Sequence, residues 1–161
     1  MEIAIKYFNE LAVDELFAIF KLRNEVFIVE QHCPYQDIDE ADRQSYHLLL
    51  SEKGQLLAYL RIIPAGVLGK EARIGRVVAR FRRRGYATMI VKEALSFMHK
   101  ELGVNEVLLE AQLYAVSLYE KCGFERISAV FLEDGIEHVR MKKHGLAMLS
   151  HSFQQSGLRI L

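Results

Sequence analysis

Residues 75–87 have the sequence Gly75-Arg76-Val77-Val78-Ala79-Arg80-Phe81-Arg82-Arg83-Arg84-Gly85-Tyr86-Ala87. The β-branched pair Val77 and Val78 favours a strand at the start of this stretch. After Ala87 the apolar residues recur every three or four positions, which is typical of one buried helix face: Ile90, Val91, Ala94, Leu95, Phe97, Met98 and Leu102. The stretch therefore predicts a strand, a basic turn and an amphipathic helix in direct succession.

The turn between the predicted strand and helix has the features of a phosphate-binding site. Backbone N–H groups at a helix start lack partners, and the helix dipole is positive there. Gly85 allows a ligand to approach the backbone closely, and the neighbouring arginines add charge. We predict a pyrophosphate cradle formed by Phe81, Arg82, Arg83, Arg84, Gly85, Tyr86 and Ala87. The Gly-x-x-x-x-Gly-Lys-Ser/Thr pattern of a P-loop is absent.

The composition of the whole chain disfavours several other classes of function. The 161 residues, 51% of them hydrophobic, suffice for one domain with a substantial core. Lys+Arg and Asp+Glu are both 21, so the net charge of zero disfavours a nucleic-acid site or membrane surface. No apolar run reaches the roughly 20 residues of a membrane span, and the N-terminus lacks the apolar core of a signal peptide. Cys33 and Cys122 have no metal-ligand spacing. We expect a soluble cytoplasmic protein with two free thiols and no metal.

The remaining pattern predicts an α/β (α+β) fold. We expect one mixed sheet of six to seven strands flanked by about four helices over residues 1–143. Its elements are a strand at 3–8, a helix from 13 to about 27, strands at 47–51, 55–63 and 71–78, a helix at 87–102, a strand at 106–111, a short helix at 115–122, and strands at 124–131 and 136–142. In the first helix we expect a buried face of Val13, Leu16, Phe17, Phe20 and Val26 or Phe27. Most carboxylates of the acidic segment 37–42 are interpreted as part of a solvated loop or short helix. Residues 144–161 form a tail that is helical, joins a dimer contact or frays.

Three segments carry a resemblance to a known family. Arg82-Arg83-Arg84-Gly85-Tyr86-Ala87 fits the Arg/Gln-x-x-Gly-x-Gly/Ala signature of the GNAT N-acetyltransferase superfamily. From Ala115 to Phe124 the chain resembles the superfamily's Asn-x-x-Ala-x-x-Leu-Tyr-Glu-Lys-x-Gly-Phe pattern, with Gln112 in the Asn position. Arg23, Val26, Phe27, Glu30 and Gln31, followed by Cys33-Pro34-Tyr35 and an Asp-rich stretch, resemble the ElaA-like branch. The resemblance covers about 143 residues and implies acetyl-CoA bound in a cleft between splayed strands.

The resemblance also implies roles at the donor site. A bulge before the phosphate loop would direct the backbone amides of Val77 and Val78 at the thioester oxygen, with Ala79 leading into the loop. Tyr119 takes the place of the acid that protonates the departing thiolate, because a phenol with a pKa of about 10 stays protonated at pH 7. Tyr114 is the lesser candidate, and a tyrosine that merely packs in the core is the alternative. Gln112 and Ser117 are also assigned to the cofactor.

The acceptor side is less determined. In many family members a Glu on this strand acts as the general base. This chain has Gly75 and Arg76 there, so Glu110 and His138 become the candidate bases. A structural histidine is an equal alternative for His138. Glu30, Gln31, Arg61 and Arg76 are assigned to the acceptor. Arg61 and Arg76 either face the cleft, where they would suit a carboxylate-bearing acceptor, or are ordinary strand charges facing solvent.

The function expected from this resemblance is acetyl transfer from acetyl-CoA to a primary amine. The amine would attack directly in a ternary complex, since neither cysteine lies in a nucleophile motif. A non-catalytic acyl-CoA-binding or regulatory module on the same fold is the alternative, and RNA binding through the arginine turn is a weaker one. A homodimer is compatible with the fold.

Overall fold

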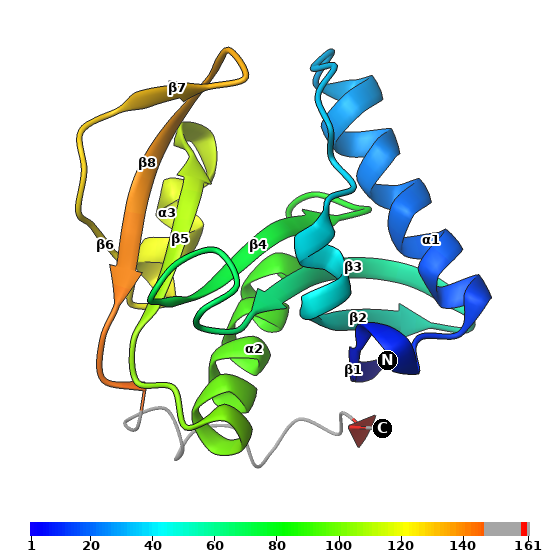
Figure 1. Ribbon diagram of the computed structural model, residues 1–161. Helices are drawn as coiled ribbons and strands as arrows, with labels where there is room; N and C mark the ends of the chain where they lie inside the picture. The colour runs from blue at the N-terminus through cyan, green and yellow to red at the C-terminus, as the bar shows by residue number, and fades with distance from the viewer. Residues whose placement is uncertain (147–158, 161) are drawn as a thin grey trace.

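The computed structural model of the protein describes residues 1–146 and 159–160, and its centre is one mixed sheet (Figure 1). The strand order is β6-β8-β5-β4-β3-β2-β1-β9, with β7 paired to β8. The β4–β5 and β1–β9 pairs are parallel, and the other pairs are antiparallel. The strands are β1 (Glu2–Tyr7), β2 (Tyr46–Glu52), β3 (Gln55–Ile63), β4 (Ala72–Ala79), β5 (Val107–Gln112), β6 (Glu125–Arg126), β7 (Phe131–Glu133), β8 (Ile136–Lys143) and β9 (Arg159–Ile160).

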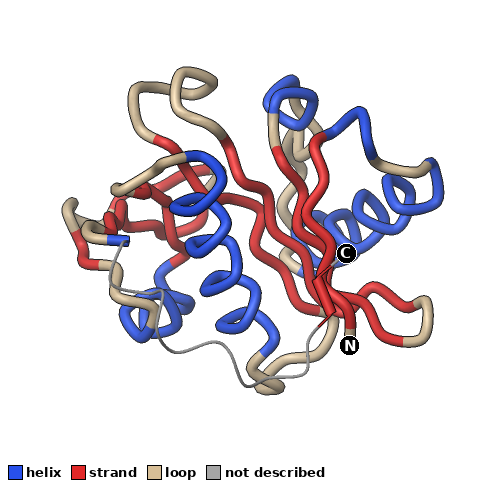
Figure 2. The backbone as a smooth tube through the Cα atoms, turned by 90° about the horizontal axis from the view of Figure 1, so that it is seen from below, coloured by secondary structure: helices blue, strands red, loops and turns tan. Residues whose placement is uncertain are grey.

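The helices cover both faces of the sheet (Figure 2). In the described residues there are three α-helices, α1 (Val13–Arg23), α2 (Tyr86–Leu102) and α3 (Val116–Lys121). A π-helical turn, η2 (Asn24–Glu30), continues α1, and a 3-10 turn, η3 (Glu40–Gln44), precedes β2. The main core lies between the sheet and α2, whose predicted face is confirmed because it contributes Ile90, Val91, Ala94, Leu95 and Met98. The mixed sheet with flanking helices is as expected, with short strands added at its edges.

The buried face of the first helix matches the prediction in part: Phe27 is buried, and Phe20 and Val26 pack against the core. Val13 and Phe17 are 84% and 67% exposed, whereas Ile19 and Leu22 are buried against β3 and β4. Arg23 is 0% exposed and also occupies a core position. A search for apolar periodicity excludes an arginine from the core and therefore missed this position.

The C-terminal part of the sheet also departs from the prediction in one place. The expected strand 124–131 is split into β6 and β7. Between them the Ser128 side chain accepts the hydrogen bond from Arg140 N at 2.8 Å, so a hydroxyl replaces a carbonyl in the ladder with β8. The hairpin turn that follows is confirmed: Asp134 and Gly135 have φ values of 50° and 75°, the geometry of a type I′ turn.

The tail was expected to be helical, dimeric or frayed. That expectation concerns mainly residues 147–158 and 161, which lie outside the described residues. Arg159 and Ile160 form β9, which pairs in parallel with Glu2 and Ile3 of β1. Within the described residues, no helix combines the length and apolar character required to cross a membrane.

Candidate active site

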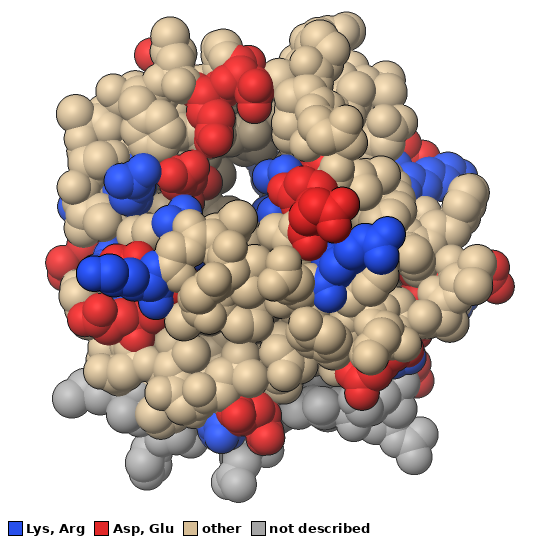
Figure 3. All heavy atoms as spheres, viewed as in Figure 1, with Lys and Arg blue, Asp and Glu red and all other residues tan. Residues whose placement is uncertain are grey.

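The site is positioned where β4 and β5 part. Their parallel ladder consists of Ala72–Arg73 opposite Val107–Leu108, and beyond it the two strands diverge (Figure 1). A cavity of about 570 Å³ occupies the divergence, a volume typical of ligand sites. In the space-filling view it opens between the two halves of the molecule, with acidic and basic side chains near its rim (Figure 3). Its lining includes Gln31, Arg61, Arg73, Arg76, Val77, Glu110, Gln112, Tyr119, Glu133 and His138.

One wall of the cavity contains a β-bulge in β4. Tyr59 pairs with Val78 and Arg61 with Gly75, so that Arg76 and Val77 together oppose one residue of β3. Arg76 has a φ of 53°, in the left-handed region that non-glycine residues rarely adopt. Such a conformation persists only where the surroundings enforce it, and it often marks a functional site. The bulge that the resemblance implied is therefore present at the expected position.

Ion pairs hold the side chain of this strained residue. Arg76 Nε lies 2.8 Å from Asp37 Oδ1, and Arg76 Nη2 lies 3.3 Å from Asp39 Oδ2. Arg76 Nη2 also donates to the main-chain oxygen of Asp37 at 3.0 Å, and the guanidinium lies over the ring of Tyr35 at 5.6 Å. These contacts fasten the bulge to the segment between η2 and η3, which preorganises the backbone of β4 at the cavity.

The same network continues into the protein interior. Arg23 Nη1 donates to Asp42 Oδ1 at 2.7 Å, and Arg61 Nη1 donates to the same oxygen at 2.9 Å. Arg23 Nε also reaches Asp37 at 2.9 Å, and Arg61 Nη1 reaches Asp39 at 2.6 Å. The interpretation of segment 37–42 as a solvated loop is therefore wrong for Asp37 and Asp42, which are buried. Burial alone would raise the pKa of Asp42, but the hydrogen bond and charge of Arg23 and the charge of Arg61 hold it below its ordinary value.

The network decides between the two sequence-based interpretations of Arg61 and Arg76. Both line the cavity, so neither is a solvent-facing strand charge. Each guanidinium is nevertheless already paired with two carboxylates of the protein. Their charge is thus largely compensated before any acceptor binds.

The predicted cradle stands at the start of α2. Gly85 is the N-cap residue with a φ of 75°, and among the described residues it gives the first turn no side-chain cap. The first intrahelical bond runs from Met89 N to Gly85 O at 3.1 Å, which leaves the earlier N–H groups available to a ligand. Residues 81–85 are exposed. Glu30, expected at the acceptor, instead pairs with Arg82 of the cradle.

Two residues of the Ala115–Phe124 motif that were assigned to the donor, Tyr119 and Ser117, lie in different surroundings. Tyr119 lines the cavity from α3 and is nearly buried, with its ring edge-on to Phe124. Burial raises the pKa of Tyr119 above its ordinary value, so the phenol stays protonated. Ser117 is exposed on α3 and is not among the described residues that line the cavity. The side chain of Val78 is buried against Tyr59, which leaves only its main chain for the predicted role.

Gln31, which was assigned to the acceptor, and Gln112, which was assigned to the cofactor, contact each other. The side-chain amides of Gln31 and Gln112 exchange two hydrogen bonds, of 3.0 and 3.1 Å. This pair links the end of η2 to the end of β5 across the cavity. Nearby, Cys33 Sγ donates to the main-chain oxygen of Asp134 at 3.4 Å. The segment after α1 is thus joined to the opposite wall by two contacts.

The candidate bases lie on that opposite wall. His138 Nδ1 is 2.7 Å from Ile136 O. Because a carbonyl oxygen only accepts, Nδ1 is the donor, and in the neutral form of the ring the lone pair lies on Nε2. The ring stacks on Phe131, and Nε2 lies 4.0 Å from Glu133 Oε2. Glu110 pairs with Arg140 across the β5–β8 ladder at 3.1 Å.

Glu133 and Arg73 are cavity residues that the sequence prediction missed. Burial raises the pKa of Glu133, and the nearby Glu110 carboxylate raises it further, while His138 opposes this shift. Glu133 reaches the cavity only through the β7–β8 pairing, where it is opposite Ile136. The Asp134–Gly135 turn was the available signal, since it fixes the register of that hairpin. The two cysteines are free, as expected, and the described residues contain no cluster of three or more metal-binding side chains.

Known proteins resemble this chain in sequence and in structure. The family model for the acetyltransferase (GNAT) domain matches residues 9–144. The UPF0039 protein C11D3.02c of Schizosaccharomyces pombe is 42% identical over 146 residues, which cover 88% of this chain and 96% of that protein. The crystal structure of an acyl-CoA N-acyltransferase from Pseudomonas aeruginosa has a TM-score of 0.82 at 36% identity and covers 89% of this chain and 99% of its own. The crystal structure of Escherichia coli ElaA has a TM-score of 0.82 at 32% identity, and the match covers 89% of this chain and 100% of the ElaA chain.

Proposed function

The chain belongs to the GNAT acetyltransferase family, and from that premise we propose that it moves an acetyl group from acetyl-CoA to a primary amine by direct attack in a ternary complex. The expected ElaA-like relationship is confirmed. The family assigns the chain N-acetyltransferase activity with an acetyl-CoA donor. The nature of the attack and the roles of individual residues form the proposal.

The observation that carries the proposal is the meeting of Tyr119 and the β4 bulge in one cavity. The bulge supports a role for the backbone N–H groups of Val77 and Val78, because the ladder to β3 is interrupted there and β5 has already diverged. Fixed donors at a carbonyl that gathers negative charge lower the barrier without reorganising during the reaction. The ion pairs of Arg76 supply that fixation.

The cofactor's phosphate groups fit the start of α2. Free N–H groups, the positive φ of Gly85 and the exposed arginines provide the donors and charge that a pyrophosphate requires. Arg82 would exchange its contact with Glu30 for a phosphate oxygen. The thioester end of the donor then reaches the cavity, where the Tyr119 hydroxyl protonates the departing thiolate.

The acceptor amine must lose a proton before or during its attack. His138 Nε2 is the base that the geometry favours, because the hydrogen bond from Nδ1 to Ile136 O leaves Nε2 with its lone pair. The Glu110 carboxylate is already engaged in an ion pair with Arg140. Glu133, beside both groups, provides negative charge that stabilises the imidazolium formed after proton transfer.

The experiment compares Tyr119→Phe with Tyr114→Phe. Tyr114 lines the same cavity but is 72% exposed, so it tests whether any cavity tyrosine serves as the acid. Acetyl-CoA affinity is measured by calorimetry, and turnover is measured by thiol release with a panel of primary amines. Tyr119→Phe should lower turnover by about 10²- to 10⁴-fold with affinity retained, whereas Tyr114→Phe should behave like the wild type. An unchanged rate in Tyr119→Phe removes it from the acid role. Binding without turnover in the wild type would favour a non-catalytic acyl-CoA-binding module.

A further inference from the structure

Arg73 differs from the other arginines of the cavity in having no acidic partner within the part of the chain that the structure describes. Arg61 and Arg76 are each paired with two carboxylates, and Arg140 is paired with Glu110 beside the cavity. No Asp or Glu among the described residues lies within ion-pair distance of Arg73, and its buried Nε lacks a hydrogen-bond partner. The Nε of Arg61 is also unpartnered, but both its Nη groups donate to Asp39 or Asp42. Of the cavity's guanidinium groups, that of Arg73 therefore retains uncompensated charge.

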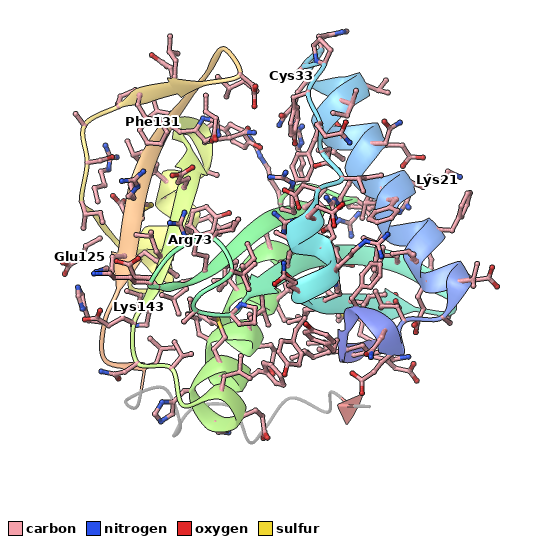
Figure 4. All side chains as sticks on the ribbon, viewed as in Figure 1. Lys21, Cys33, Arg73, Glu125, Phe131 and Lys143 are labelled. Carbon is pink, nitrogen blue, oxygen red and sulfur yellow. The ribbon has the colours of Figure 1, made fainter. Side chains whose placement is uncertain are left out.

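The backbone holds Arg73 at the base of the cleft. It pairs with Ile63 of β3 and with Leu108 of β5, in the last rung before β4 and β5 part. Figure 4 shows Arg73 beside β5 near this junction, and its side chain lines the cavity. The residue is thus fixed on both sides of its strand.

The loop before β4 restricts the guanidinium further. A Cβ built on Gly69 would lie 3.1 Å from Arg73 Nη2, so the loop backbone passes directly beside this group. The loop is closed by a 2.7 Å hydrogen bond from Gly66 N to Gly69 O. A side chain confined in this way loses little conformational freedom when it binds a ligand.

A partly buried guanidinium without an anion is costly, and a carboxylate meets its forked N–H geometry with two parallel hydrogen bonds. We infer that Arg73 binds a carboxylate of the acceptor, which makes amino acids or peptides with a free carboxyl group the acceptor class. This inference rests on the acetyltransferase function proposed above. It transfers to Arg73 the role that the sequence suggested for Arg61 and Arg76.

The wall that carries the candidate bases extends from Arg73 along β5. Glu110 follows Leu108, the β5 partner of Arg73, by two residues, or about 6.6 Å along a parallel strand. His138 lies farther along, since it pairs with Gln112, four residues or about 13 Å beyond Leu108. A carboxylate at Arg73 would therefore direct the rest of the acceptor along β5, toward the wall that carries Glu110, Glu133 and His138.

The test compares matched acceptors that differ only in the carboxyl group. The panel contains the twenty L-amino acids, their C-terminal amides, the corresponding decarboxylated amines and two dipeptides. Thiol release from saturating acetyl-CoA gives kcat and KM for the wild type, Arg73→Gln and Arg73→Lys. Arg126→Gln is the matched control, because Arg126 is an exposed arginine of β6 that pairs with Glu120. Calorimetry with acetyl-CoA and thermal melting monitor donor binding and folding in each variant.

We expect the wild type to prefer the free acid over its amide by about 10- to 100-fold in kcat/KM, mainly through KM. Arg73→Gln should abolish this preference, Arg73→Lys should retain part of it, and Arg126→Gln should retain all of it. Transfer to dipeptides but not to free amino acids would identify a peptide C-terminus as the source of the carboxylate. If Arg73→Gln fails to fold, the wild-type preference and Arg73→Lys still decide the question.

Equal rates for acids and amides in the wild type, or a preference that survives in Arg73→Gln, would overturn the inference while leaving the acetyltransferase function intact. Acetyl-CoA binding without transfer to any amine of the panel would instead refute the proposed function, and the inference with it.

Discussion

Replacement of Asp42 by Asn probes the buried ion-pair network directly. Asp42 is 1% exposed and accepts hydrogen bonds from Arg23 Nη1 at 2.7 Å, Arg61 Nη1 at 2.9 Å and the main-chain N of Asp39 at 3.1 Å. An asparagine of the same shape removes the negative charge and turns an N–H donor toward a guanidinium. Arg23 would then retain only Asp37, and Arg61 only Asp39.

The expected cost follows from burial. Removing one partner of a buried charge pair destabilises a protein by about 3 to 5 kcal/mol, because the remaining charge stays out of water without compensation. That is a large part of the roughly 5 to 15 kcal/mol that stabilises a typical domain. For a chain of this length it corresponds to a fall in Tm of about 6 to 20 °C.

Urea unfolding followed by far-UV circular dichroism measures the change, since the chain has no tryptophan for fluorescence. Glu40→Gln is the control: it removes the same charge from the same segment, but Glu40 is 89% exposed and pairs only with Arg43 at 3.6 Å. This control should change the free energy of unfolding by less than about 1 kcal/mol. A loss of under about 1 kcal/mol in Asp42→Asn would contradict the assignment of the network as a major source of stability.

The pH dependence gives a second check on Asp42. Its pKa is lower in the folded than in the unfolded protein, because Arg23 and Arg61 outweigh the opposing effect of burial. The stabilisation by its carboxylate is therefore complete above the unfolded pKa of about 4 and is lost as the pH falls through the lower folded value. The difference in unfolding free energy between the wild type and Asp42→Asn should shrink in that acidic range, and a constant difference would argue against the pairing.

The remaining predictions concern the donor cradle and the base. Gly85→Val should weaken acetyl-CoA binding at least about 10-fold by calorimetry, because a β-branched residue resists the φ of 75° on which the cradle depends. Gly54→Val, at a φ of 76° in the β2–β3 turn, introduces the same backbone strain away from the cradle and should bind acetyl-CoA normally. Equal losses of affinity in both variants would mean that the Gly85→Val effect comes from lower stability and not from the cradle. His138→Gln should lower kcat by about 10²- to 10⁴-fold. A variant that keeps the wild-type rate would assign the base elsewhere.

The features predicted correctly are those decided by neighbouring residues. The start of α2 at Gly85, its buried face and the Asp134–Gly135 hairpin depend on backbone preferences and periodicity within short segments. The burial of Arg23 on α1 was missed because its partners lie 14 and 19 residues away, which no local pattern reveals. The split between β6 and β7 depends likewise on Ser128 bonding to a strand twelve residues further on.

For the candidate site, the sequence led to part of the wall. Tyr119, Glu110, Gln112 and His138 all line the cavity. Glu30 and Ser117 do not belong to its described lining, since Glu30 contacts the cradle and Ser117 faces solvent. Arg73 and Glu133 escaped prediction because they belong to no motif and reach the cavity through strand pairing.

The sequence by itself therefore determined the family, the order of elements and the chemistry available at the phosphate turn, because these depend on residue types at short spacing. Only the tertiary structure decided which charges remain uncompensated. Arg61, Arg73 and Arg76 are indistinguishable as arginines on strands, and their roles differ because folding brings Asp37, Asp39 and Asp42 to two of them and leaves the third without an acid among the described residues. The energy of a charge depends on the dielectric and the partners around it, and both are set by contacts between distant parts of the chain.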